Sequence, residues 1–190
     1  MRRRVMLTIA LLGAGLFSTM AMASEPDNSH RIGVSFFWGS TKVADPESDR
    51  EQNFSDFNGY NLFYRYQWDP QYGVELAYRQ GSMGIGSVAS NIFIGELEDI
   101  DYRAISISGY AGYPLTQQQQ LYAKLGLSQN RVAMQYRTRR FSETKVGVIG
   151  AVGWQYQFNN GLGFQTEASY SSGKTFKSFG TVLFGLNYRF

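Results

Sequence analysis

The final stretch of the chain, residues 178–190, alternates between apolar side chains and small or polar ones. Only Leu183 breaks the alternation. The apolar set is Val182, Phe184, Leu186, Tyr188 and Phe190, and the residues between are Thr181, Leu183, Gly185, Asn187 and Arg189. A period of two predicts a β-strand rather than a helix. Because the apolar face has no obvious core to meet, the pattern favours a strand whose outer face lies in lipid. The alternative is an amphipathic closing strand of a soluble β-sandwich.

Seven earlier segments show the same alternation between an apolar and a polar face. They cover residues 31–42, 57–68, 72 onward, 102–113, 121 onward, 146–158 and 162–170. One face of each segment is rich in Val, Ile, Leu and aromatic residues, and the other carries mostly Gly, Ser, Gln, Asn, Arg and Glu. A soluble barrel would place its apolar residues inside, and these polar inward sets argue against that. The pattern predicts an all-β fold, namely a closed eight-stranded antiparallel up-and-down transmembrane β-barrel.

The connections between these strands are alternately short and long. Short turns are expected at 69–71, 114–119 and 159–161, and Asn159-Asn160-Gly161 is the plainest hairpin signal. Four longer loops, at 43–56, 81–101, 137–145 and 171–177, would then emerge together at the opposite, extracellular end. After Gln129 the apolar residues change parity, which either a β-bulge or an extracellular extension of the fifth strand would explain.

Charged residues are expected inside the barrel. A three-residue turn at 69–71 places Arg65 opposite Glu75 and Asn61 opposite Arg79, so we predict an interior charge network of Arg65, Glu75 and Arg79. An ordinary surface salt bridge on a soluble sheet is the alternative. The bulky inward residues predict a filled lumen rather than a pore. They are Phe37, Phe63, Tyr110 and Tyr122.

The amino terminus has the composition of an export signal. Arg2, Arg3 and Arg4 precede an apolar run, and Ala21-Met22-Ala23 forms a small-x-small cleavage site. We therefore predict a cleaved signal peptide over 1–23 and a mature barrel over 24–190, with a retained anchor as the alternative. The chain has 18 Lys and Arg against 15 Asp and Glu. Three of the basic residues lie in the expected signal, so the mature charge is balanced and does not indicate nucleic-acid binding. There is no cysteine, and neither a metal nor a cofactor is expected.

The ending Gly185-Leu186-Asn187-Tyr188-Arg189-Phe190 and the run from Tyr60 to Tyr66 resemble the Ail/OmpX/Lom family of small outer-membrane proteins. OmpA-type and opacity-type barrels share much of the pattern. The resemblance implies a bacterial outer-membrane protein, surrounded by lipid and lipopolysaccharide, whose external loops contact host matrix or serum proteins. It also implies that Tyr188 and Phe190 belong to the signal that the barrel assembly machinery reads. It brings no catalytic motif.

The leading functional hypothesis is a surface adhesion or host-interaction protein associated with virulence. The candidate binding residues lie in the second and third loops, because Tyr, Phe and Arg are typical of binding hot spots. They are Phe93, Tyr136, Arg139, Arg140 and Phe141. Alternatively, these charges only solvate the loops, or the protein is structural and binds lipopolysaccharide. A lipid-modifying or proteolytic enzyme would need a nucleophile activated by a base. The sole histidine, His30, lies at the short-turn end, so we expect no enzyme.

Overall fold

The computed structural model describes residues 29–44, 51–83, 97–136, 139–172 and 176–190. The predicted signal peptide at 1–23 and the candidate residue Phe93 lie outside these ranges. Eight strands are present: β1 (Ser29–Ala44), β2 (Glu51–Gln67), β3 (Tyr72–Met83), β4 (Leu97–Pro114), β5 (Gln119–Tyr136), β6 (Arg139–Gln157), β7 (Leu162–Ser172) and β8 (Phe176–Arg189). Within the described ranges, no helix is long and apolar enough to cross a membrane.

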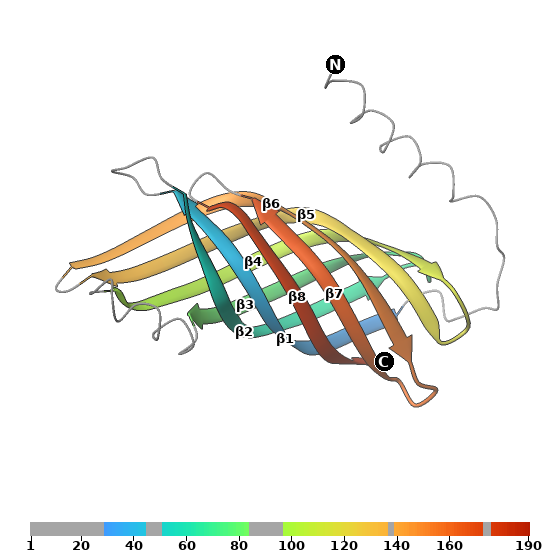
Figure 1. Cartoon of the computed structure of the whole chain (residues 1–190). Coiled ribbons are helices and arrows are strands. Elements are labelled where there is room, and N and C mark those ends of the chain that lie inside the picture. Colours follow the sequence, from blue (N-terminus) through green and yellow to red (C-terminus); the bar gives the residue numbers. More distant parts are fainter. Residues whose placement is uncertain (1–28, 45–50, 84–96, 137–138, 173–175) are drawn as a thin grey trace, which may run out of the picture.

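The strands form one closed barrel in sequence order, and every strand is antiparallel to its neighbours (Figure 1). Closure occurs where β1 pairs with β8, from Arg31 opposite Arg189 to Val43 opposite Phe176. Next to the Arg31–Arg189 pair, at the end of the seam, the backbones of His30 and Phe190 exchange two hydrogen bonds of 3.1 and 3.0 Å. The predicted closed eight-stranded antiparallel barrel is therefore confirmed.

The two faces of each strand differ as the alternation predicted. On β8 and at the terminal residue that follows it, the even-numbered residues from Val182 to Phe190 are exposed on the outer surface, whereas Thr181, Leu183 and Asn187 are buried inside. Leu183, the apolar exception on the inner face, is 1% exposed and packs in an apolar cluster of the lumen. The outside of the barrel carries large apolar side chains on every strand, up to 69% exposed at Leu125. This surface suits acyl chains rather than water.

The short turns and the carboxyl terminus lie at one end of the barrel (Figure 1). Outward-facing aromatic residues gather near this end, as expected of a membrane-interface girdle. They include Tyr66, Trp68, Tyr72, Tyr113, Phe158, Tyr188 and Phe190. Two side chains from a run of four glutamines at 117–120 link the short turns to one another. The side-chain amide of Gln120 donates to the carbonyl of Pro70 (3.0 Å), and that of Gln118 donates to Asn159 Oδ1 (3.3 Å).

The opposite end is uneven, because β5 and β6, with β4 beside them, project further than the other strands (Figure 1). Their pairing continues without a bulge from Gln119 opposite Tyr156 to Tyr136 opposite Arg139. The predicted loop at 137–145 is therefore wrong from Arg139 onward, because β6 begins there. The change of parity after Gln129 is explained by an extension of the fifth strand and not by a β-bulge. Beyond the membrane no lipid selects apolar residues on the outer face, so the alternation that marks a strand fades although the backbone pairing persists.

The other predicted loops are also shorter than expected. β1 reaches Ala44 and β2 begins at Glu51, where the sequence pattern predicted a loop over 43–56. β3 extends to Met83 and β4 begins at Leu97, within the predicted loop at 81–101. β7 and β8 likewise end and begin inside 171–177. In each case polar residues continue the hairpin, because paired backbone groups satisfy one another in water as well as in lipid.

The hairpin turn between β6 and β7 requires glycine at position 161. Gly161 has φ of 87°, and a Cβ there would lie 2.7 Å from the carbonyl oxygen of Arg189. We predict that Gly161→Ala lowers the free energy of unfolding by roughly 1–2 kcal/mol. Urea unfolding in lipid vesicles, followed by tryptophan fluorescence, measures the change. Gly180→Ala is the control, since a Cβ at Gly180 meets nothing within 4 Å. Equal losses in both variants would contradict this explanation.

Candidate functional site

The interior of the barrel contains a cluster of four ionised side chains. Arg65 Nη2 lies 2.6 Å from Glu75 Oε2, and Lys124 Nζ lies 2.5 Å from Glu75 Oε1. The same ammonium lies 2.6 Å from Glu167 Oε2. These residues come from β2, β3, β5 and β7, so the cluster crosses the lumen rather than following neighbouring strands. Two cations and two carboxylates make it neutral, which is the condition under which buried charge is tolerated.

Aromatic rings and an amide surround Arg65, which is fully buried. Its guanidinium carbon lies 3.9 Å from the ring centroid of Tyr110 and 5.1 Å from that of Tyr122, both within cation–π range. Its Nη1 donates to Gln155 Oε1 (3.0 Å). The hydroxyl of Tyr122 donates in turn to Glu167 Oε2 (2.9 Å), so the aromatic and ionic contacts form one network.

Arg65 and Glu75 lie opposite each other on β2 and β3, and Asn61 lies opposite Arg79, as the three-residue turn predicted. Arg79, however, is not part of the ionic cluster. It donates to Ser169 Oγ (3.3 Å) and Thr181 Oγ1 (3.2 Å), and its guanidinium lies over the Phe37 ring. No carboxylate within the described ranges forms an ion pair with it.

Lys124 and Glu167 complete the cluster in place of Arg79, and neither was predicted as a member. Their inward parity and opposite charges were the available signal. Their contact depends on the stagger of the strands around the barrel, because β5 and β7 are not paired to each other. The alternation of side chains along a single strand does not reveal how far the strands are staggered, so this contact could not be predicted from it.

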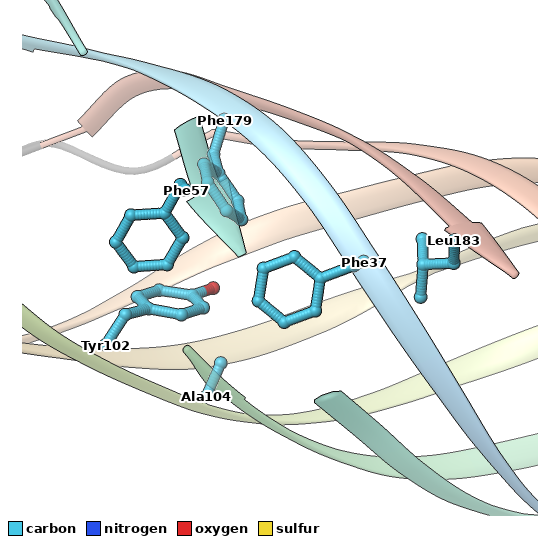
Figure 2. Packing of buried hydrophobic residues seen from close by; sticks show 6 residues of the cluster. All are labelled: Phe37, Phe57, Tyr102, Ala104, Phe179 and Leu183. Atoms are coloured by element: carbon cyan, nitrogen blue, oxygen red, sulfur yellow. The ribbon is translucent and has the colours of Figure 1, made fainter. Parts of the chain in front are cut away.

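A second interior cluster is apolar and lies toward the long-loop end. Figure 2 shows the rings of Phe57, Tyr102 and Phe179 close together, with Phe37 and Leu183 further along the lumen. The centroid distances among those three rings are 5.2 to 5.5 Å, and two of the three contacts are edge-to-face. The four predicted filling residues, Phe37, Phe63, Tyr110 and Tyr122, are all buried. Side chains therefore occupy the lumen at both levels.

The predicted binding residues are brought together only in part. Tyr136, Arg139, Arg140 and Phe141 all lie on the projecting β5–β6 hairpin, where Tyr136 is opposite Arg139 and Gln135 is opposite Arg140. The acidic stretch before β4 lies beside the same hairpin, since Asp99 pairs with Gln135 and Asp101 with Ala133. No group of three His, Cys, Asp or Glu side chains suitable for a metal occurs in the described parts of the chain.

The residues of the expected insertion signal lie on the outer surface at the short-turn end. Phe190 is 62% exposed and stacks on the His30 ring with a centroid distance of 5.7 Å. Tyr188 is exposed beside it and stacks on Phe190 in turn. The role of Tyr188 and Phe190 in an insertion signal stays a prediction.

An apolar exterior, a filled polar lumen and unequal ends define an integral outer-membrane-type β-barrel. A family model described as outer membrane protein beta-barrel domain matches residues 9–190, and the chain belongs to this family. It is a protein of the bacterial outer membrane. Among curated proteins, no sequence matches the chain.

Solved structures share the fold at low sequence identity. Ail, the attachment invasion locus protein of Yersinia pestis, is 20% identical, with a TM-score of 0.62 over 87% of this chain and 100% of that one. Neisserial surface protein A is 12% identical, with a TM-score of 0.61 over 88% and 100%. OprG from Pseudomonas aeruginosa is 14% identical, with a TM-score of 0.54 over 86% and 95%. The predicted resemblance to Ail-like barrels is thus confirmed for the fold.

The ionic cluster allows a direct test of how the lumen is stabilised. We predict that Lys124→Met lowers the free energy of unfolding by about 3–5 kcal/mol, because Glu75 and Glu167 lose the ammonium between them. Arg79→Met is the matched control. It removes a buried cation that has only neutral partners, so we expect a change within about 1 kcal/mol.

Both variants are measured by urea unfolding in vesicles of the same lipid. Adding Glu167→Gln to Lys124→Met should recover part of the loss, because the charge left unpaired is then removed. If the Arg79 variant were as unstable as the Lys124 variant, the ionic cluster would not be the element that distinguishes the two sites.

Proposed function

We propose that this protein is a surface adhesion protein whose β5–β6 hairpin binds anionic, sulfated ligands of the host matrix. The observation that carries the proposal is the charge of the projecting strands. Residues 131–145 contain Arg131, Arg137, Arg139, Arg140 and Lys145 against the single carboxylate of Glu143. Of these basic residues, Arg131 and Lys145 have side chains that the structure describes. Both are exposed, and both lie at the base of the hairpin.

The geometry of the hairpin supports this role. Within the described residues β6 pairs with β7 only from Val148 onward, whereas β5 keeps β4 as its neighbour to its last residue, Tyr136. Among the described residues, 139–147 of β6 therefore pair with β5 on one side and with no strand on the other. An edge strand that stands beyond the membrane brings its cations within reach of an extended polyanion.

The comparison with Ail adds chemical support. Ail of Yersinia pestis has been solved in complex with the heparin analogue sucrose octasulfate, in a structure 19% identical to this chain with a TM-score of 0.59 over 87% of this chain and 100% of that one. A polysulfated ligand fits an arginine-rich surface, because guanidinium groups bind such anions by charge-assisted hydrogen bonds. We therefore place the same class of ligand on the β5–β6 hairpin.

Substitution of the two adjacent arginines tests the proposal. We predict that Arg139→Ala together with Arg140→Ala weakens binding of a heparin oligosaccharide by roughly tenfold or more. The protein is used in detergent-free nanodiscs, and binding is measured by surface plasmon resonance at several salt concentrations. Arg139→Lys with Arg140→Lys retains the charge and should bind with an intermediate affinity. Unchanged affinity of the alanine variant would refute a role for these residues.

A second candidate function is contact with lipopolysaccharide at the outer rim. Arg103 on β4 and Arg131 on β5 lie directly opposite each other, and both are exposed. They lie just beyond the apolar outer residues Ile105, Leu127 and Val146. Like charges in such a pair repel each other unless an anion lies between them, and lipid phosphate would supply one. Asp101, also exposed, is the nearest described carboxylate on the same face of β4.

The rim arginines are tested in nanodiscs with and without lipopolysaccharide. We predict that lipopolysaccharide raises the thermal midpoint of the wild-type protein more than that of the Arg103→Gln, Arg131→Gln variant. The difference should shrink with dephosphorylated lipid, because phosphate is the expected partner. An equal shift in both proteins would mean that these arginines do not bind the lipid.

We also propose that the protein has no enzymatic activity. The support is the position of His30, whose Nδ1 lies 2.6 Å from the Tyr64 hydroxyl and whose ring is packed between Tyr66 and Phe190 at the short-turn end. Among the described residues no serine hydroxyl is hydrogen-bonded to this ring. Release of a fatty acid or a fluorogenic peptide by the purified barrel would contradict the proposal.

A further inference from the structure

The apolar cluster of the lumen joins parts of the barrel that the strand order keeps apart. Phe37 and Phe57 belong to β1 and β2, Phe179 to β8 and Tyr102 to β4. Tyr102 contacts Phe57 and Phe179 across the lumen, with ring centroids 5.5 and 5.2 Å apart (Figure 2). Since β4 is paired with neither β2 nor β8, this ring contact links β4 to the opposite wall through side chains alone.

Tyr102 also has a polar contact on its own side of the barrel. Its hydroxyl donates to Asn130 Oδ1 over 2.8 Å, and both residues are buried. The Asn130 amide donates in turn to Ser128 Oγ (2.9 Å) and the Ser128 carbonyl (3.3 Å). The side chain of Asn130 is thus held at both its oxygen and its nitrogen, and the donor at the oxygen is Tyr102.

Asn130 lies at the base of the β5–β6 hairpin. It pairs with Ala104 on one side and with Lys145 on the other, and Arg131 follows it. Beyond this level β6 has no β7 partner within the described residues, whereas β4 continues beside β5 from Arg103 opposite Arg131 to Leu97 opposite Tyr136. Among the side chains that the structure describes, the contact at Asn130 is the last buried one on β5 before the β5–β6 hairpin, which from here on has only β4 beside it.

From this arrangement we infer that Tyr102 is a positioning residue for the binding hairpin: its ring is fixed in the lumen cluster and its hydroxyl holds the base of β5 through Asn130. Because the ring is anchored by Phe57 and Phe179, the orientation of the hairpin is coupled to the opposite wall of the barrel. A preorganised hairpin loses less conformational freedom on binding, so the contact sets the lifetime of the complex. This inference rests on the proposed function for its binding readout only.

The test removes the hydroxyl and keeps the ring. Tyr102→Phe should increase amide hydrogen exchange at 131–147 by roughly fivefold, because one buried hydrogen bond at the base is lost. Exchange at 121–127, deeper in the same strand, should not change. Tyr110→Phe is the matched control, since it also deletes a lumen hydroxyl on β4, but one bonded to Gln120 at the short-turn end. It should leave exchange at 131–147 unaltered.

A second variant and a second readout separate the possible outcomes. Asn130→Ala should reproduce the exchange increase of Tyr102→Phe, and combining the two should add little, because both remove the same contact. A heparin oligosaccharide should dissociate from Tyr102→Phe about three to five times faster, with little change in the association rate. Unchanged exchange at 131–147 in Tyr102→Phe would overturn the inference. If exchange rises but heparin binds neither the variant nor the wild-type protein, the positioning role stands and the proposed ligand is wrong.

Discussion

Acyl chains offer no hydrogen-bonding partner to a peptide backbone, and this constraint accounts for most of the architecture. Every N–H and C=O group at membrane depth must be paired within the protein, so the sheet has to close without a free edge. β1 and β8 provide that closure along their length, ending in the paired backbones of His30 and Phe190. Once the sheet closes, one face of every strand lies in lipid and the other in a narrow lumen.

The lumen is filled in two different ways along its length. Toward the short turns, Arg65, Glu75, Lys124 and Glu167 form a neutral ionic cluster enclosed by tyrosines. Toward the long-loop end, an aromatic cluster fills the lumen. Each member of the ionic cluster has a partner of opposite sign, and the buried Arg79 instead donates to the hydroxyls of Ser169 and Thr181, whereas the aromatic rings pack without such partners. The apolar level lies toward the end of the barrel from which β4, β5 and β6 project.

Strand faces could be predicted from the sequence because lipid imposes a strict alternation on the outer surface. Val182, Phe184 and Leu186 are apolar at alternate positions, and this alone predicts that they face lipid. The pairing of Arg65 opposite Glu75 follows from the length of the turn at 69–71. Where lipid no longer acts, prediction failed. The residues from Arg139 onward were expected in a loop because nothing outside the membrane selects their alternation. Lys124 and Glu167 were missed as partners because their contact crosses the lumen and depends on strand stagger.

The apolar exterior is the claim on which both the localisation and the surface function depend, and spin labels test it directly. The chain has no native cysteine, so a single label can be placed in turn at Val152, Ala168 and Val182, which lie side by side on β6, β7 and β8. In the protein folded in lipid vesicles, we predict frequent collisions with oxygen and few with a water-soluble nickel chelate at all three positions. Ready access of the nickel chelate to all three labels in the folded protein would contradict the account.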